Sequence, residues 1–255
     1  MSDAEEGRRI RVFDLNRPAK ANALDAATVE ALSAFLDLAE NDGVPLVVLQ
    51  GSARVFSAGL DLSELESESD ESLLYRLVRI QLLLERVERA TPLTVAIVEG
   101  AAIGSGADLA LAAAVRIALP TASIRFPGAQ FGAVLGTARL ASLSSPDYAT
   151  YLTSTGARVE AREAAERGLW KVLPELADAR TEIYRLLDSE LALPAGTGRL
   201  LRRAVSPCAG TDPLGALVRS LAEPGLVDRV RRYVQRQRYP APATARCRQE
   251  EGELT

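Results

Sequence analysis

Two glycine-containing turns hold the residues best suited to chemistry in this chain. Residues 57–61 read Ser-Ala-Gly-Leu-Asp, residues 104–108 read Gly-Ser-Gly-Ala-Asp, and each turn follows an apolar run. The second turn also opens an Ala- and Leu-rich segment that is typical of a helix. N–H groups at a helix start have no partner within the helix and lie at the positive end of its dipole, so they suit an anion or a developing oxyanion. Small residues let a ligand approach the backbone closely.

Other glycine-rich motifs do not fit these turns. A dinucleotide-binding fingerprint needs a third glycine where Leu109 stands. The chain has no P-loop, and Gly-Ser-Gly differs from the nucleophile elbow G-x-S-x-G. Taken singly, each turn is more typical of an ordinary tight turn than of a site.

The absence of histidine restricts the possible chemistry. With no histidine in the sequence, Ser-His-Asp and Cys-His catalysis and His-based zinc sites are excluded. Any proton transfer must therefore fall to Asp, Glu, Tyr, Lys, Cys or water. No metal site is expected.

The composition is that of a globular protein. The 255 residues are 47% apolar and 25% charged, and the formal net charge of −4 argues against a nucleic-acid partner. The polar N-terminus does not resemble a signal peptide, and no apolar run is long enough to predict a membrane span. Cys208 and Cys247 are far apart and indicate no disulfide framework. We expect a cytoplasmic protein without a membrane partner.

The residues that flank the two turns predict alternating strands and helices, hence an α/β fold. Strands are predicted at residues 10–15, 45–49, 93–98, 115–119 and 123–126. Helices are predicted after an Asp25 N-cap, from 73 to 87, from 108 to 113, from 161 to 167 before Gly168, and from 226 to 238. The acidic residues 64–72 are expected to be exposed, and the chain is mostly helical from about residue 137.

Several spaced segments, in consistent order from about residue 10 to 172, resemble the crotonase superfamily, the enoyl-CoA hydratase/isomerase family. They are residues 17–24, 47–51, 55–62, 94–109, 115–118, 136–140 and 161–169. The resemblance implies a crotonase-like ββα spiral core over residues 1–190 and a helical trimerisation region over 191–239. Residues 240–255 are expected to form a disordered tail. A homotrimer, or a hexamer built as a dimer of trimers, is implied as well.

The resemblance also implies roles for named residues. The family binds acyl-CoA thioesters, with CoA as part of the substrate and no separate cofactor, and stabilises an enolate with two backbone N–H groups. By motif position these belong to Leu60 and Ser105. CoA contacts are implied for Lys20, Ala21, Ala23, Ala58, Gly59, Asp61, Tyr233 and Arg236. Tyr233 and Arg236 are equally consistent with a solvated helix face.

The catalytic side chains depart from the family pattern. Hydratases of the family use two glutamates, but here the first position is Asp108 and the second is Gly128. Asp108 is predicted to be the main acid/base group, although an acid at a helix start can also merely offset the dipole. Losing a general acid or base lowers the reaction rate about 10²- to 10⁴-fold, so efficient hydration is not expected. Four nearby polar residues offer substitutes but are more typical of turns and surfaces: Ser57, Glu64, Glu99 and Gln130.

Three functions remain open on the sequence. The first is an enoyl-CoA hydratase/isomerase-like lyase or isomerase in which Asp108 alone moves protons. The second is a CoA-thioester-binding pseudoenzyme. The third is a specialised biosynthetic crotonase that performs decarboxylation or C–C bond chemistry on the same scaffold.

Overall fold

The chain folds into two stacked sheets in a spiral. The computed structural model describes residues 9–206 and 210–238. The larger sheet is parallel, in the order β1-β2-β4-β6-β9. Its strands are β1 (Ile10–Asp14), β2 (Leu46–Gln50), β4 (Leu93–Val98), β6 (Val115–Ala118) and β9 (Lys171–Val172). The smaller sheet has the order β3-β5-β7-β8 and is parallel except for its β7–β8 pair.

Successive turns of the spiral contribute one strand to each sheet. The smaller sheet consists of β3 (Val55–Ser57), β5 (Ala101–Ile103), β7 (Ser123–Arg125) and β8 (Arg158–Glu160). Along the chain, β2 and β3 precede helix α3, β4 and β5 precede helix α4, and β6 and β7 follow. This repeat confirms the predicted ββα spiral core.

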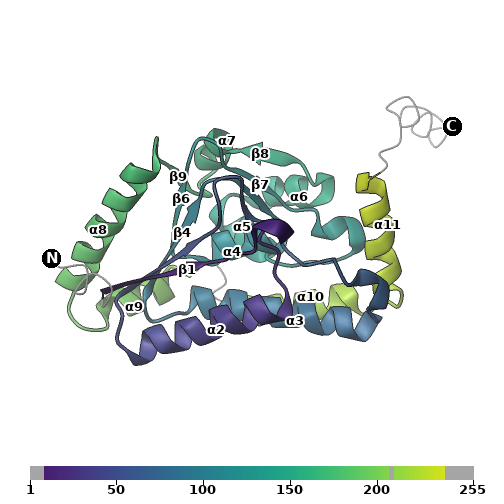
Figure 1. The fold of residues 1–255 in the computed structure, drawn as a ribbon, viewed down its shortest axis with the longest axis horizontal. Helices are drawn as coiled ribbons and strands as arrows, with labels where there is room; N and C mark the ends of the chain where they lie inside the picture. The colour runs from purple at the N-terminus through teal and green to yellow at the C-terminus, as the bar shows by residue number, and fades with distance from the viewer. Residues whose placement is uncertain (1–8, 207–209, 239–255) are drawn as a thin grey trace.

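Ten α-helices surround these sheets in the described residues (Figure 1). They are α2 (Ala26–Asn41), α3 (Asp70–Glu88), α4 (Ser105–Ala112), α5 (Thr137–Leu143), α6 (Pro146–Thr155), α7 (Ala161–Glu166), α8 (Leu176–Ala192), α9 (Thr197–Ala204), α10 (Pro213–Leu221) and α11 (Leu226–Arg238). Three short 3₁₀ helices are η1 (Pro18–Lys20), η2 (Leu65–Ser67) and η3 (Gly128–Phe131). None of the described helices is long and apolar enough to cross a membrane.

The larger sheet is covered on both faces, which explains its continuous apolar strands. In β4 every residue is buried, and alternate residues face different clusters. Ala96 and Val98 belong to the main core, whereas Val95 and Ile97 pack with Ile183 of α8. Figure 1 shows α8 along the outer side of this sheet.

The sequence predicted the longer helices and strands correctly. Asp25 accepts the Thr28 N–H at 2.8 Å as the N-cap of α2, and α11 has the predicted bounds. Gly168 follows α7 with a φ of +81°. The short strands β3, β5, β8 and β9 were not predicted, and α4 begins at Ser105 rather than at residue 108.

The expectation for residues 64–72 was wrong in part. Leu65 is buried, and Glu68 is ion-paired with Arg76, so the acidic segment is anchored to the fold. Ser69 caps α3 through a reciprocal capping box with Ser72. The predicted tail, residues 240–255, lies outside the described residues, as do Cys208 and Cys247.

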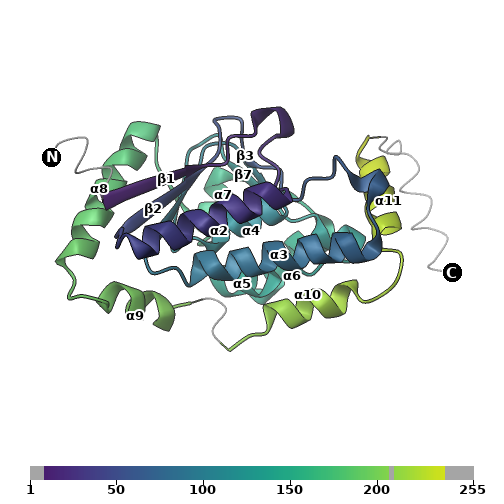
Figure 2. The same ribbon diagram turned by 60° about the horizontal axis from the view of Figure 1, so that its bottom comes forward.

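The C-terminal helices pack on their own chain. Figure 2 shows α10 beside α3, and a separate apolar cluster joins α3 to Leu217 of α10 and Val230 of α11. The side chain of Asp70, the first residue of α3, accepts the Val227 N–H at 2.8 Å. Helix α8 crosses the predicted boundary at residue 190. Trimerisation through residues 191–239 stays a prediction.

Candidate active site

The two glycine-containing turns touch each other. Gly59 has a φ of +83°, and a β-carbon there would lie 2.5 Å from the Ile103 carbonyl oxygen and 3.1 Å from the Ser105 nitrogen. At Gly106 a β-carbon would lie 2.5 Å from the Ser57 carbonyl oxygen. Both positions therefore require glycine, because any larger residue would push the two turns apart.

The N-terminal segment holds the first turn in place. The Leu24 N–H donates to the Gly59 carbonyl at 2.7 Å, and the Asp61 N–H donates to the Leu24 carbonyl at 3.1 Å. The Ala58 N–H donates to the Ala21 carbonyl at 2.9 Å. Every N–H of this turn from residue 58 to 61 thus has a partner, except one.

That exception is Leu60, whose N–H has no acceptor among the described residues. The Ser105 N–H is likewise unpaired within the described part of the chain, because Ser105 is the first residue of α4. The two turns meet at Gly59 and Ser105, so these donors belong to neighbouring parts of one surface. Two such N–H groups can bind a carbonyl oxygen as it gains negative charge.

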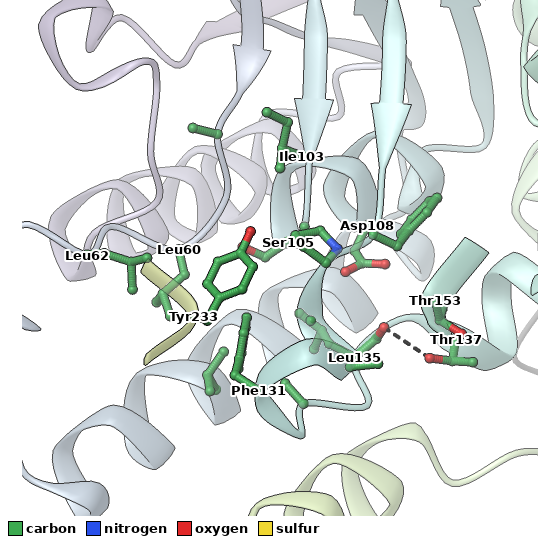
Figure 3. A pocket seen from close by; sticks show the side chains of 18 residues that line it. Leu60, Leu62, Ile103, Ser105, Asp108, Phe131, Leu135, Thr137, Thr153 and Tyr233 are labelled. Carbon is green, nitrogen blue, oxygen red and sulfur yellow. Dashed lines mark hydrogen bonds between the residues drawn. The ribbon is translucent and has the colours of Figure 1, made fainter. Parts of the chain in front are cut away.

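A cavity of about 120 Å³ opens at this surface (Figure 3). Six of the predicted site residues line it: Ala58, Leu60, Ser105, Asp108, Gly128 and Tyr233. Most of its other walls are apolar, formed by Leu62, Leu77, Ile103, Phe126, Phe131, Ala133 and Leu135, among others. A ligand group of moderate size and apolar character fits such walls.

Asp108 is the carboxyl group of this cavity. It lies on α4 and is only 3% exposed, and its Oδ1 atom has no hydrogen-bond partner among residues 9–206 and 210–238. Burial raises the pKa of Asp108 to about 8, although the charge of Arg139 opposes the shift. The side chain is therefore mostly protonated at neutral pH, and it can both give and accept a proton near that pH.

The start of α5 packs directly against Asp108. A β-carbon at Gly136 would lie 1.8 Å from the Asp108 Oδ1 atom, and Gly136 has a φ of +64°. Only glycine leaves room for the carboxyl group there. Residues 136–140 resemble a family segment in the sequence, but the contact of Gly136 with Asp108 was not predicted, although a glycine before a helix is a signal that could have suggested it.

Arg139 was also missed by the sequence analysis. It is 1% exposed, and its Nη2 atom donates to the Glu88 Oε2 atom at 2.6 Å. This ion pair ties α5 to Glu88, the last residue of α3. A buried guanidinium needs such a partner, and its charge acts on the nearby carboxyl group.

Gly128, predicted from the resemblance to occupy the second catalytic position, has no side chain that could carry a proton. It is the first residue of η3, and its carbonyl accepts the Ala133 N–H at 3.0 Å. Among the described residues that line the cavity, Asp108 is the only carboxylic acid. The lack of a second acid, read from the sequence, is thus a feature of the site.

The four possible substitutes do not line the cavity. The Ser57 hydroxyl donates to the Asn22 carbonyl at 2.8 Å, and the Gln130 amide donates to the Thr155 carbonyl at 3.2 Å. Glu64 is exposed and Glu99 is half-buried. The interpretation as turn and surface groups is wrong for Ser57, which is buried at the end of β3, and it agrees with the exposure of Glu64.

The predicted CoA-contacting residues fall in two places. Ala21 and Ala23 lie along the first turn, and Lys20 beside them is exposed. The Asp61 carboxylate is paired with Arg17 at 2.9 Å. Burial opposes its ionisation, but hydrogen bonds from Ser63 and Arg17 outweigh burial and lower the pKa of Asp61. Asp61 therefore fastens the N-terminal segment to the turn.

The other two predicted CoA contacts lie on α11. Arg236 is exposed, and its Nη2 atom donates to the Gln130 carbonyl at 3.4 Å. Tyr233 is buried in the cavity of its own chain, so the solvated-face interpretation is wrong for Tyr233. No contact with CoA is tested by the structure, and all eight assignments stay predictions.

A two-sheet ββα spiral with touching glycine-containing turns beside a cavity defines a protein of the crotonase fold. Residues 5–195 match the sequence model of the enoyl-CoA hydratase/isomerase family. The chain belongs to this family.

Individual relatives agree with this assignment. A Bordetella parapertussis structure whose name assigns it to the enoyl-CoA hydratases/isomerases is 35% identical, with a TM-score of 0.82 and 92% and 96% of the two chains covered. A "Probable enoyl-CoA hydratase" of Bacillus subtilis is 36% identical over 167 residues, 63% of this chain. The 2,3-dehydroadipyl-CoA hydratase of Escherichia coli is 33% identical over 63% of this chain. In both alignments this chain spans 64% of the relative's length.

Proposed function

We propose that this chain is an enzyme that binds an acyl-CoA thioester and stabilises its enolate. One observation carries the proposal. Two unpaired N–H groups, of Leu60 and Ser105, belong to touching turns that line the same cavity as Asp108, a buried carboxyl group without a partner on Oδ1. The names of the relatives, which include a CoA-thioester hydratase, support the same substrate class.

The mechanism follows from the charges that develop. The thioester oxygen accepts hydrogen bonds from the Leu60 and Ser105 N–H groups. When ionised Asp108 removes a proton from the α-carbon, the C–H electron pair moves into the acyl group and the oxygen becomes negative. The two N–H groups stabilise this charge more than they stabilise the neutral carbonyl, which lowers the barrier. Removing one such donor costs about 2.7 to 4 kcal/mol in comparable sites.

The single carboxyl group favours reactions that need one proton carrier. Asp108 can take a proton from one carbon and return it to another carbon, which is an isomerisation. Hydration additionally needs a group that activates water, and Gly128 supplies none. We therefore place the chain among isomerase- or lyase-type members and expect little hydration.

The missing second acid favours two further candidates. The first is a CoA-thioester binder without catalysis, which would keep the N–H donors but would need no acid at position 128. A specialised enzyme for decarboxylation or C–C bond formation would use the enolate with one carboxyl group.

A cytoplasmic homotrimer or hexamer is part of the proposal as well, and a monodisperse monomer in sedimentation at micromolar concentration would contradict that assembly.

Calorimetry with crotonyl-CoA and crotonate tests the substrate class. The thioester is expected to bind much more tightly, because it alone offers both the nucleotide portion and the thioester carbonyl. Equal affinities for the two compounds would contradict the proposed ligand, whatever the catalytic outcome.

A further inference from the structure

Tyr233 is a buried tyrosine that has no role in the proposed site formed by the N–H groups of Leu60 and Ser105. It lies on α11, 9% exposed, and its ring packs against Phe131 with centroids 5.4 Å apart. The Arg229 Nε atom donates to the Phe131 carbonyl at 3.1 Å, and Val227 is bound to Asp70. These contacts fix α11 over the cavity, so the position of the tyrosine ring is set by the fold.

The hydroxyl group of Tyr233 is directed at the donor side of the cavity. Figure 3 shows the ring extending away from α11, with its oxygen on the side of Ser105. The hydroxyl makes no hydrogen bond within the described part of the chain, and it is open to the cavity. The Ser105 Oγ atom, in the same region, is buried and has no partner among the described residues. Two hydroxyl groups that lack protein partners beside one cavity indicate a place for a ligand oxygen.

The local environment keeps Tyr233 a hydrogen-bond donor. Burial raises the pKa of the Tyr233 phenol, with the charge of Arg125 opposing the shift, so the hydroxyl retains its proton at neutral pH. A donor in a mostly apolar cavity interacts strongly with a developing negative charge. The walls near it, Phe131 and Leu60, cannot compete for that hydrogen bond.

The geometry points to Tyr233 as a third hydrogen-bond donor to the thioester oxygen, beside the N–H groups of Leu60 and Ser105. This inference rests on the proposed function, because it needs an acyl-CoA oxygen in the cavity. It makes α11 part of the catalytic site of the same chain. No bond is formed or broken at Tyr233, which donates a hydrogen bond that strengthens as the enolate forms.

The test compares wild type with Tyr233→Phe, which keeps the ring against Phe131 and removes only the hydroxyl. Two quantities are measured: deuterium exchange at the α-carbon of butyryl-CoA in D₂O, and the absorption maximum of bound cinnamoyl-CoA, which moves to longer wavelength when its carbonyl is polarised. We expect kcat for exchange to fall about 10²- to 10³-fold with KM within a few-fold. The red shift of the bound chromophore is expected to shrink.

Tyr151→Phe is the matched control, because Tyr151 lies on α6, is 56% exposed and does not line the cavity. It is expected to behave as wild type. A Tyr233→Phe variant with an unchanged exchange rate and red shift would overturn the inference about Tyr233 alone. If wild type gives neither exchange nor a red shift, the proposed function fails and the role of Tyr233 fails with it. Melting temperatures show whether each variant is folded.

Discussion

The two walls of the cavity are built on different principles. The amide wall consists of Leu60 and Ser105, which contribute main-chain N–H groups. The carboxyl wall consists of Asp108 and the loop from Pro127 to Gly136, which must contribute side chains. A backbone donor survives replacement of the residue that carries it, whereas a proton carrier is lost when its side chain is lost. Under the proposed function, the amide wall therefore keeps the arrangement that the resemblance implies, while the carboxyl wall departs from it.

This difference separates two chemical tasks. Glycine contacts between the turns fix the amide wall, so its function depends on close packing. The carboxyl wall depends on the identity of Asp108 and on the space that Gly136 leaves for it. Substitutions that act on one wall at a time can therefore separate charge stabilisation from proton transfer.

The largest effect is expected at the carboxyl wall. Asp108→Asn removes the proton carrier but keeps the shape of the side chain, so α-proton exchange of bound acyl-CoA should fall about 10²- to 10⁴-fold. Affinity should stay within a few-fold. Exchange is measured by NMR in D₂O and affinity by calorimetry.

Asp147→Asn is the control for this substitution. Asp147 also lies in the first turn of a helix, α6, but it is exposed and does not line the cavity. If Asp108 merely offsets the helix dipole, both substitutions would leave exchange unchanged. That result would contradict Asp108 as the proton carrier, and a wild type with neither exchange nor hydration would favour the binder over the enzyme.

The amide wall is tested by Gly59→Ala. The added methyl group would lie 2.5 Å from the Ile103 carbonyl oxygen, so the turns must separate and the N–H groups lose their alignment. Exchange should fall about 10²- to 10³-fold. Gly43→Ala controls for backbone strain, because Gly43 has a φ of +63° but open space around its β-carbon position. Equal activity in both variants, with intact folds, would contradict the assigned donors.

Placing a carboxyl group at position 128 should partly restore hydration activity. Gly128→Glu should raise hydration of crotonyl-CoA by about tenfold or more, since a general acid or base contributes about 10²- to 10⁴-fold when well placed. The new β-carbon would lie 3.1 Å from the Ala133 carbonyl oxygen, so the loop must yield slightly. Ala129→Glu adds the same charge one residue away and is expected to have less effect. Hydration is measured from the loss of enoyl absorbance, and an equal response in both variants would contradict the assignment of position 128.

The smallest effect is on stability. The pKa of Asp108 is raised from 3.8 to about 8, so between these pH values the unfolded chain loses a proton that the folded chain keeps. The free energy of unfolding contributed by this group therefore falls as pH rises through that range and levels above it. Asp108→Asn removes the dependence. The difference in melting temperature between Asp108→Asn and wild type should grow from pH 4 to pH 8; a constant difference would contradict the raised pKa.

The parts of the fold that follow from local sequence were predictable. β4 is a continuous apolar run and α2 has an aspartate cap, so each has its own signal. β3 and β5 have three residues each, and both depend on strand pairing, β3 with β5 and β5 with β7 as well. Such short strands have no periodicity of their own to detect.

The site residues that lie in local sequence motifs were predictable. Leu60, Ser105 and Asp108 lie in recognisable turns, and the structure brings them to one cavity. The contacts of Asp108 with Gly136 and of Tyr233 with Phe131 join residues far apart in sequence. They depend on how α5 and α11 pack, which no local pattern encodes.

The pH dependence of α-proton exchange tests the central claim most directly. For butyryl-CoA, kcat/KM for exchange in D₂O reports the ionisation of the free enzyme, after subtraction of the rate of Asp108→Asn. With Asp108 as the base, kcat/KM should rise with pH and level off above about 8, the pKa that burial gives this group. A pH-independent rate, or one that Asp108→Asn shares with wild type, would contradict the account.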